Sequence, residues 1–127
     1  MRIVDRKTFL EMPTNTVFTT YEPTIFGPLT IKGESIEGSP FGGYVGDYFE
    51  TPIMQVKDDK RNGVFAYRIL EEAEEDSSYS FDLGLYAEGR DGSFEEDQLY
   101  AVFEKKDIEY LISRLQDCIP RTSGFKH

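Results

Sequence analysis

The spacing of apolar positions near the start of the chain predicts a short helix over residues 5–12. Asp5 is its expected N-cap, because an Asp side chain there can accept a hydrogen bond from the first turn. Val4 and Phe9 have the spacing of a hydrophobic staple across this helix start. Pro13 is expected to end the helix, since proline lacks the backbone N–H that a further turn needs.

Three strands are expected in the residues that follow. Segments 16–22 and 29–36 are rich in β-branched and aromatic residues, which is typical of strands. A loop is expected over 37–48, where four glycines and a proline interrupt the pattern. Segment 49–57 is expected to form the third strand, and Pro52 within it favours an edge position or a bulge.

The segment 63–75 allows two interpretations. Its second half is rich in good helix formers, and one face at helical spacing is apolar. That face consists of Phe65, Ala66, Ile69, Leu70 and Ala73. Residues 64–70 would also suit a strand after a turn at Asn62 and Gly63. Of the two, we predict the helix.

Alternating apolar and polar residues predict a hairpin in the last third of the chain. Its half-buried first strand is expected over 79–85 and its partner strand over 98–104, with a turn through 89–92. A helix over 108–118 is expected to follow, capped by Asp107 and ended by Pro120. Its predicted buried stripe consists of Ile108, Leu111, Ile112 and Leu115.

The order of these elements predicts a single domain over residues 1–127. Short connections between many antiparallel candidates favour an α+β fold. We expect an antiparallel sheet of about four to five strands, with two to three helices packed on one face.

Charge is unevenly distributed along the chain. The protein has 14 basic and 24 acidic residues, a net charge of −10. Residues 71–97 contain 11 of the acidic residues and one basic residue, so this segment carries the whole net charge. Direct binding to nucleic acid is not expected, because contacts to phosphates need Lys and Arg.

Part of the acidic segment occupies positions that a helix normally avoids. Acidic residues at a helix C-terminus oppose the dipole, and like charges at i, i+4 repel one another. Such a violation of local rules is typical of a functional surface, although an ordinary solvated face is the alternative. The candidate partner-binding residues are Glu71, Glu72, Glu74, Glu75 and Asp76, with a second block of Glu95, Glu96 and Asp97. If the hairpin packs beside the helix, the two blocks form one negative surface for a basic partner.

Residues for catalysis or metal binding are scarce. His127, the single histidine, ends the chain, so a triad or a zinc site built from several histidines is not expected. Cys118 continues the last helix stripe and is expected to be a buried or half-buried structural thiol. The alternating acids between Asp91 and Asp97 lack the spacing of an EF-hand. We expect no enzyme activity, no cofactor and no metal site.

A glycine-rich loop with aromatic residues supports an alternative function. Its large rings could stack on a nucleotide base, and basic residues soon after it could contact a phosphate. The residues are Phe41, Tyr44, Tyr48, Lys57, Lys60 and Arg61. On this interpretation the chain binds a small ligand and sequesters a nucleotide signal. In the competing interpretation, the aromatic rings pack over the core and the basic residues serve only solubility.

Two stretches, residues 2–10 (RIVDRKTFL) and 89–104 (GRDGSFEEDQLYAVFE), carry a resemblance to known proteins. They are similar to small uncharacterised acidic proteins of phages and prophages. The resemblance implies an accessory protein in the cytoplasm of a bacterial host cell. Small phage proteins of this kind frequently block host defence, as anti-CRISPR proteins and DNA mimics do. No site residues transfer from the resemblance.

Charge and resemblance together favour a non-enzymatic interaction protein. We expect a phage-encoded inhibitor of a host defence complex that binds nucleic acid, acting through an acidic, DNA-mimic-like face. Its partner is expected to be a basic host protein. The single cysteine, the lack of a run of about 18 apolar residues and the charged start favour a cytoplasmic protein without membrane contact. A homodimer remains open.

Overall fold

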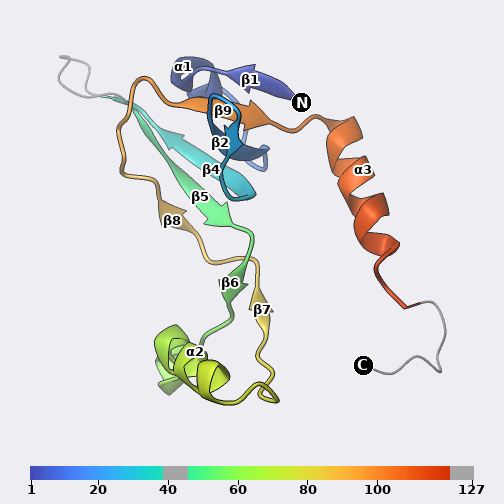
Figure 1. Ribbon diagram of the computed structural model, residues 1–127. Coiled ribbons are helices and arrows are strands. Elements are labelled where there is room, and N and C mark those ends of the chain that lie inside the picture. The colour runs from blue at the N-terminus through green and yellow to red at the C-terminus, as the bar shows by residue number, and fades with distance from the viewer. Residues whose placement is uncertain (39–45, 121–127) are drawn as a thin grey trace.

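The computed structural model describes residues 1–38 and 46–120, and these residues form an α+β fold on an antiparallel sheet (Figure 1). The strands are β1 (Arg2–Val4), β2 (Val17–Glu22), β3 (Ile25–Phe26), β4 (Thr30–Ile36), β5 (Asp47–Pro52), β6 (Gln55–Val56), β7 (Leu83–Gly84), β8 (Gly89–Arg90) and β9 (Leu99–Val102). The helices are α1 (Arg6–Leu10), α2 (Ala66–Glu75) and α3 (Lys105–Gln116), with a 3₁₀ turn η1 (Lys60–Asn62).

The main sheet has the strand order β1-β9-β2-β4-β5-β8, and β3 pairs with β2 outside this path. Strands β6 and β7 form a separate two-stranded sheet. The predicted α+β class is therefore confirmed, but the described residues contain more strands than the four or five expected. Within those residues, no helix has the length and apolar character needed to cross a bilayer.

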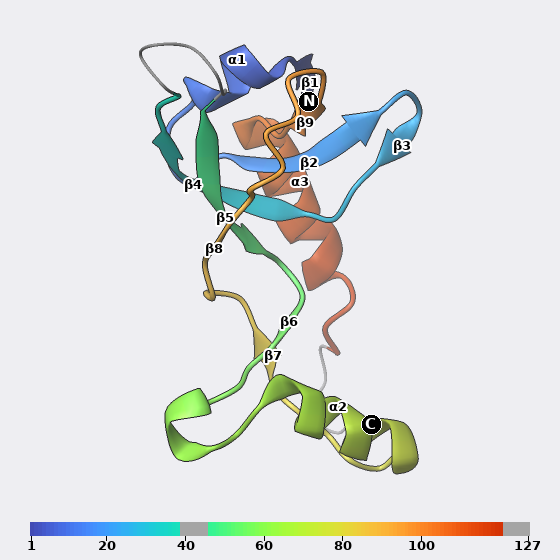
Figure 2. The ribbon, with the colours of Figure 1, turned by 90° about the vertical axis from the view of Figure 1, so that its left-hand side faces the viewer.

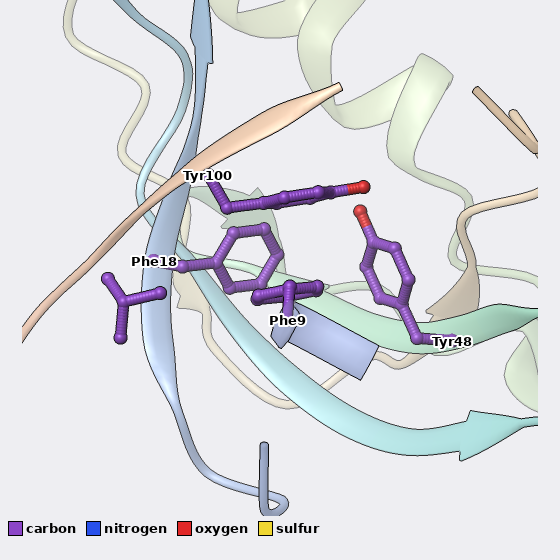
Figure 3. Packing of buried hydrophobic residues seen from close by; sticks show 5 residues of the cluster. Phe9, Phe18, Tyr48 and Tyr100 are labelled. Carbon is purple, nitrogen blue, oxygen red and sulfur yellow. The ribbon is translucent and has the colours of Figure 1, made fainter. Parts of the chain in front are cut away.

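Four aromatic rings form the centre of the core (Figure 3). Phe9 from α1 stacks on Tyr100 from β9, with ring centroids 4.0 Å apart and planes 2° apart. Phe18 from β2 lies 4.5 Å from the Phe9 ring, and Tyr48 from β5 meets that ring edge-on at 5.0 Å. Phe9 thus contacts rings from three strands, and these contacts hold α1 against the sheet.

The first helix follows the predicted start signal closely. The Asp5 carboxylate accepts a hydrogen bond from the backbone N–H of Thr8 at 2.8 Å, as expected of an N-cap. Val4 packs against the core cluster that contains Phe9, so the two staple residues reach the same core. The helix ends at Leu10, a little before the expected limit.

The first strands also lie where they were predicted, as β2 and β4. The predicted strand over 49–57 is divided into β5 and β6, and Pro52 is the last residue of β5. β5 is not an edge strand, because it pairs with both β4 and β8. The irregularity lies instead in the β4–β5 pairing, where the register shifts between Lys32 and Ser35.

The predicted hairpin between 79–85 and 98–104 is wrong. Strand β9 lies between β1 and β2 in the main sheet, whereas β7 pairs with β6. The expected turn includes β8, which pairs with β5. Strand β9 carries Tyr100 and Val102 into the core, and burial of these side chains decides its partners. The alternation of apolar and polar residues within a segment does not determine which strand that segment pairs with.

Strands β6 and β7 lead away from the main sheet and carry α2 at their far end (Figures 1 and 2). We call residues 53–87 the arm. The helix predicted over 63–75 is confirmed for its main part as α2. Val64 precedes it in an isolated β-bridge with Asp59, so the competing strand pattern appears only as this single pair.

The last helix differs from its prediction in the residue at which it begins and in the burial of its apolar stripe. It begins at Lys105, because Glu104 is its N-cap and Asp107 completes a capping box at the third helical position. The expected stripe is not buried: Ile108 and Leu111 are half-buried, while Ile112 and Leu115 are exposed. Cys118, expected to be sheltered, is also exposed. The cause is that α3 extends away from the sheet beyond β9 (Figure 1), so the three helices do not share one layer.

We expect Phe9→Ala to lower the free energy of unfolding by about 3–5 kcal/mol, because it leaves a cavity among three other rings. Urea denaturation measures this loss. Phe26→Ala is the matched control, since Phe26 is exposed, and it should cost less than about 1 kcal/mol. Equal losses in the two variants would contradict the role given to Phe9.

Candidate interaction surface

The acids of α2 form a continuous exposed surface at the end of the arm. We call this set the acidic ridge: Glu71, Glu72, Glu74, Glu75 and Asp76. None of its members forms a salt bridge among the described residues. Four of them lie in the second half of α2, where the helix dipole is negative and a basic side chain would be favourable. The ridge is thus a concentrated, largely uncompensated negative charge.

Asp76 differs from the other ridge residues, because it has a structural role. Its carboxylate accepts hydrogen bonds from the backbone N–H of Ser78 at 2.9 Å and from the Ser78 hydroxyl at 2.6 Å. These bonds, the hydroxyl's first, lower the pKa of Asp76. Asp76 therefore shapes the exit from α2, and the four glutamates remain for a partner.

The second acidic block does not join the ridge. Glu95 and Asp97 line a hollow beside Pro23, and Glu96 lines another beside Lys7. Both hollows belong to the main sheet and its surroundings, whereas α2 lies at the end of the arm (Figure 2). The single negative surface expected from the two blocks is therefore absent from the described residues, because it depended on the hairpin that does not form.

Large apolar side chains accompany the ridge on the arm. Tyr67 and Leu70 on α2 are exposed, and so are Phe81, Leu83 and Tyr86 in the segment that returns through β7. An open hollow of about 280 Å³ lies along β6 and β7. Exposed apolar groups beside charged ones are typical of protein-binding surfaces. The sequence analysis had placed Leu70 on the apolar face of the helix and had assigned Phe81 and Leu83 to a half-buried strand over 79–85, so it did not predict their exposure.

The alternative ligand site does not come together as expected. Phe41 and Tyr44 lie outside the described residues. Tyr48 is fully buried in the aromatic core and cannot stack on a ligand. Burial first, and then the neighbouring Tyr100, raise the pKa of its phenol. Lys57, Lys60 and Arg61 are exposed on the arm, remote from the Tyr48 ring because β6 carries the chain away from β5.

A buried ionic cluster, which sequence reasoning missed, lies beside the aromatic core. Arg6 is 2% exposed and Asp47 is 1% exposed. The Arg6 guanidinium donates hydrogen bonds to the Tyr100 hydroxyl at 2.8 Å and to the Gly46 carbonyl at 2.9 Å. It also lies 3.6 Å from a carboxylate oxygen of Asp47 and 3.6 Å from one of Asp91. No pattern signalled this burial, because Arg6 stands between two charged residues of a short helix.

The Asp47 carboxylate joins β5 to the segment that follows β8. It accepts a hydrogen bond from Arg90 at 2.6 Å and bonds from the backbone N–H of Gly92 at 3.0 and 3.1 Å. Burial by itself would raise the pKa of Asp47, but the bond from Arg90 and the backbone N–H bonds outweigh it and lower the pKa. The charged groups of the cluster are paired with one another, although the buried Nε of Arg6 has no hydrogen-bond partner among the described residues. The cluster therefore connects α1, β5 and β9.

Lys32 is a second buried charge with a structural role. Its ammonium donates hydrogen bonds to the Gly33 carbonyl at 3.0 Å and to the Ser35 hydroxyl at 2.8 Å. Ser35 in turn donates to the Leu10 carbonyl at 2.6 Å. Burial lowers the pKa of Lys32. The chain of bonds joins the irregular part of β4 to the end of α1. Among the described residues, no group of three or more His, Cys, Asp or Glu side chains is placed to hold a metal ion.

We expect Asp47→Asn to destabilise the fold at pH 7 by about 3 kcal/mol, because it removes the buried carboxylate that pairs with both Arg6 and Arg90 and leaves Arg6 with Asp91 alone. Since the folded-state pKa of Asp47 lies below its ordinary value of 3.8, its contribution is present above that value and is lost as the pH falls through the folded-state pKa. Urea denaturation between pH 7 and pH 2 should show the variant and the wild type converging at the acid end. A constant difference would contradict the assignment.

Glu50 should behave with the opposite sign. Burial first, then the carboxylates of Asp91 and Asp47, raise the pKa of Glu50 above its ordinary 4.5. Its ionisation therefore opposes folding as the pH rises from 4.5 through the folded-state pKa. Glu50→Gln should be more stable than the wild type at pH 7 and equal to it below pH 4.5. The control Glu34→Gln, at an exposed position of β4, should change nothing. A destabilised Glu50→Gln at pH 7 would overturn this reading.

Comparisons with known proteins identify no family for this chain, since no protein-family model, no curated protein and no solved structure matches it.

Proposed function

We propose that this protein is a non-enzymatic, phage-encoded inhibitor that acts in the bacterial cytoplasm. It binds a basic, nucleic-acid-binding protein or complex of host defence and occupies the surface meant for nucleic acid. The observation that carries the proposal is the acidic ridge at the end of the arm, whose four glutamates are exposed and form no salt bridges among the described residues.

The position of the ridge suits this role. Carboxylates at helical neighbour spacing repeat every few ångströms and can stand in for phosphates on a basic surface. Their opposed fields would accelerate association, and salt would screen that effect. Because the arm leads α2 away from the main sheet (Figure 1), the ridge can enter a groove that the sheet itself could not.

The exposed apolar residues of the arm would contribute binding affinity that ion pairs alone do not provide. Surface ion pairs contribute little affinity, whereas buried aromatic side chains often dominate an interface. Tyr67 and Leu70 lie on α2 with the ridge glutamates, and Tyr86 lies just after β7. A partner that presents basic residues around an apolar floor would use both sets.

Sequestration of a nucleotide is the weaker proposal. It relied on stacking by Tyr48, which is part of the core. The basic residues it invoked lie on the arm, away from the Tyr48 ring.

We expect charge reversal of the ridge to abolish partner binding. The variant replaces Glu71, Glu72, Glu74 and Glu75 by Lys. The immobilised wild type should capture a basic nucleic-acid-binding protein from bacterial lysate at low salt and release it at high salt, whereas the variant should capture none. Mass spectrometry identifies the released protein.

The matched control reverses four exposed acids of the sheet body: Glu11, Glu22, Glu34 and Glu37. It changes the net charge equally and should retain capture. Thermal unfolding checks the fold of both variants. Reversal of the ridge should raise stability by about 1 kcal/mol, since lysines suit a helix C-terminus. Capture that survives ridge reversal, or that both variants lose equally, would refute the proposal.

A further inference from the structure

Lys32 is a buried basic side chain without an acidic partner among the described residues. It is 2% exposed, yet it forms no salt bridge with any of them. Glu50 lies opposite Lys32 in the β4–β5 register but forms no ion pair with it, and the Phe9 ring lies 5.8 Å from the Lys32 Nζ. A buried ammonium normally has a carboxylate partner, because loss of hydration makes the charged form costly. Burial accordingly lowers the pKa of Lys32 below its ordinary 10.5.

An irregularity in strand β4 brings Lys32 beside Ser35. In a regular strand, side chains three positions apart point to opposite faces of the sheet. The β4–β5 register shifts between Lys32 and Ser35, and a bulge of this kind redirects side chains. The Lys32 Nζ consequently lies 2.8 Å from the Ser35 Oγ, and it also bonds the Gly33 carbonyl at 3.0 Å. A hydroxyl, a base within hydrogen-bond distance and a third group that orients the base are the parts of an activated nucleophile.

Ser35 is the accessible member of this pair. It is exposed, and it lines a hollow of about 410 Å³ between α1 and the end of β4. Leu10 and Ile36 give part of the lining an apolar character. The charged residues along the hollow are Lys7, Glu11 and Glu37. This mixed lining would accommodate a short acyl chain attached to a polar group.

We propose that Ser35 is an activated nucleophile that accepts an acyl group from an activated ester or thioester of a short carboxylic acid, with Lys32 as its general base. The Ser35 Oγ attacks the carbonyl carbon of the donor, while the neutral Lys32 amine takes the hydroxyl proton. The bond from the carbonyl carbon to the leaving oxygen or sulfur then breaks. The Lys32 ammonium returns its proton to that leaving group. The products are an ester on Ser35 and a free alcohol or thiol.

The geometry favours the serine over the lysine as the acylated group. The Lys32 side chain is buried, so the carbonyl of a donor in the hollow cannot reach its Nζ, whereas Ser35 is exposed. The Ser35 hydroxyl donates to the Leu10 carbonyl at 2.6 Å and can turn to the Nζ once the amine is neutral. A buried lysine with a lowered pKa provides this neutral amine closer to pH 7 than an exposed lysine does.

This reaction is separate from binding by the acidic ridge. Lys32 and Ser35 lie on β4 of the main sheet, whereas the ridge lies on α2 at the end of the arm (Figure 2). A single transfer uses one donor molecule per chain and requires no turnover, so it is compatible with a non-enzymatic inhibitor. Either proposal can therefore fail without affecting the other.

Incubation with p-nitrophenyl acetate tests the proposal, because the released p-nitrophenolate can be followed by its absorbance. The wild type should release one p-nitrophenolate per chain in a fast phase, and peptide mass spectrometry should place the acetyl group on Ser35. Ser35→Ala should abolish the fast phase. Ser80→Ala is the matched control: it removes an exposed serine of the arm and should react like the wild type.

Lys32→Met separates proton transfer from packing, since Met fills the space of the lysine stem without supplying a base. The fast phase should slow by about 100-fold or more, and thermal unfolding checks that the variant folds. In the wild type the rate should rise with pH and level off below pH 10.5, because Lys32 loses its proton there. This profile and the peptide map decide the question even if Lys32→Met does not fold. Absence of a fast phase, acetylation of lysines alone, or a fast phase that Ser35→Ala or Lys32→Met retains would each overturn the proposal.

Discussion

Burial of the Phe9 ring is the interaction on which the rest of this structure depends. The ring contacts three aromatic side chains from three strands of the main sheet. It can do so because Asp5 starts a helix of only five residues that presents Phe9 to the sheet. Arg6 lies three positions earlier on the same helix face, so the burial of Phe9 also places the Arg6 guanidinium beside Asp47. Helix α1 thus contributes one residue to the aromatic core and one to the buried charge cluster.

The core that results is small, and this has consequences for the rest of the chain. Its buried cluster holds five side chains, from α1, β2, β5 and β9. The arm and α3 supply none of them, although both contain many large apolar residues. Many of those residues are exposed, although Ile69 on the arm is buried. Because exposed apolar area is costly in water, these two elements leave the largest unfavourable contacts with solvent uncompensated by the core.

The two peripheral elements, α2 and α3, differ in how their charged residues are arranged. Helix α3 obeys the electrostatic rules of an isolated helix: it has a capping box at its start and Arg114 in its last turn. Helix α2 breaks them, with acids at its end and no side-chain cap at its start. The first arrangement is that of a helix with balanced charge. The second suits a strongly positive partner. One small fold can therefore present two surfaces of different chemistry.

The sequence by itself determined the local features of this protein. Capping by Asp5, the β-branched runs of β2 and β4, the helical periodicity of α2 and the segregation of charge all depend on neighbouring residues. The tertiary structure decided which strands pair, and it separated the ridge from Glu95, Glu96 and Asp97. It also buried Tyr48 and Asp47 and left Leu115 exposed. The physical reason is that strand pairing and burial depend on contacts between residues far apart in the sequence, such as the hydrogen bond from Arg6 to Tyr100. The pattern of neighbouring residues carries no information about the energies of such contacts.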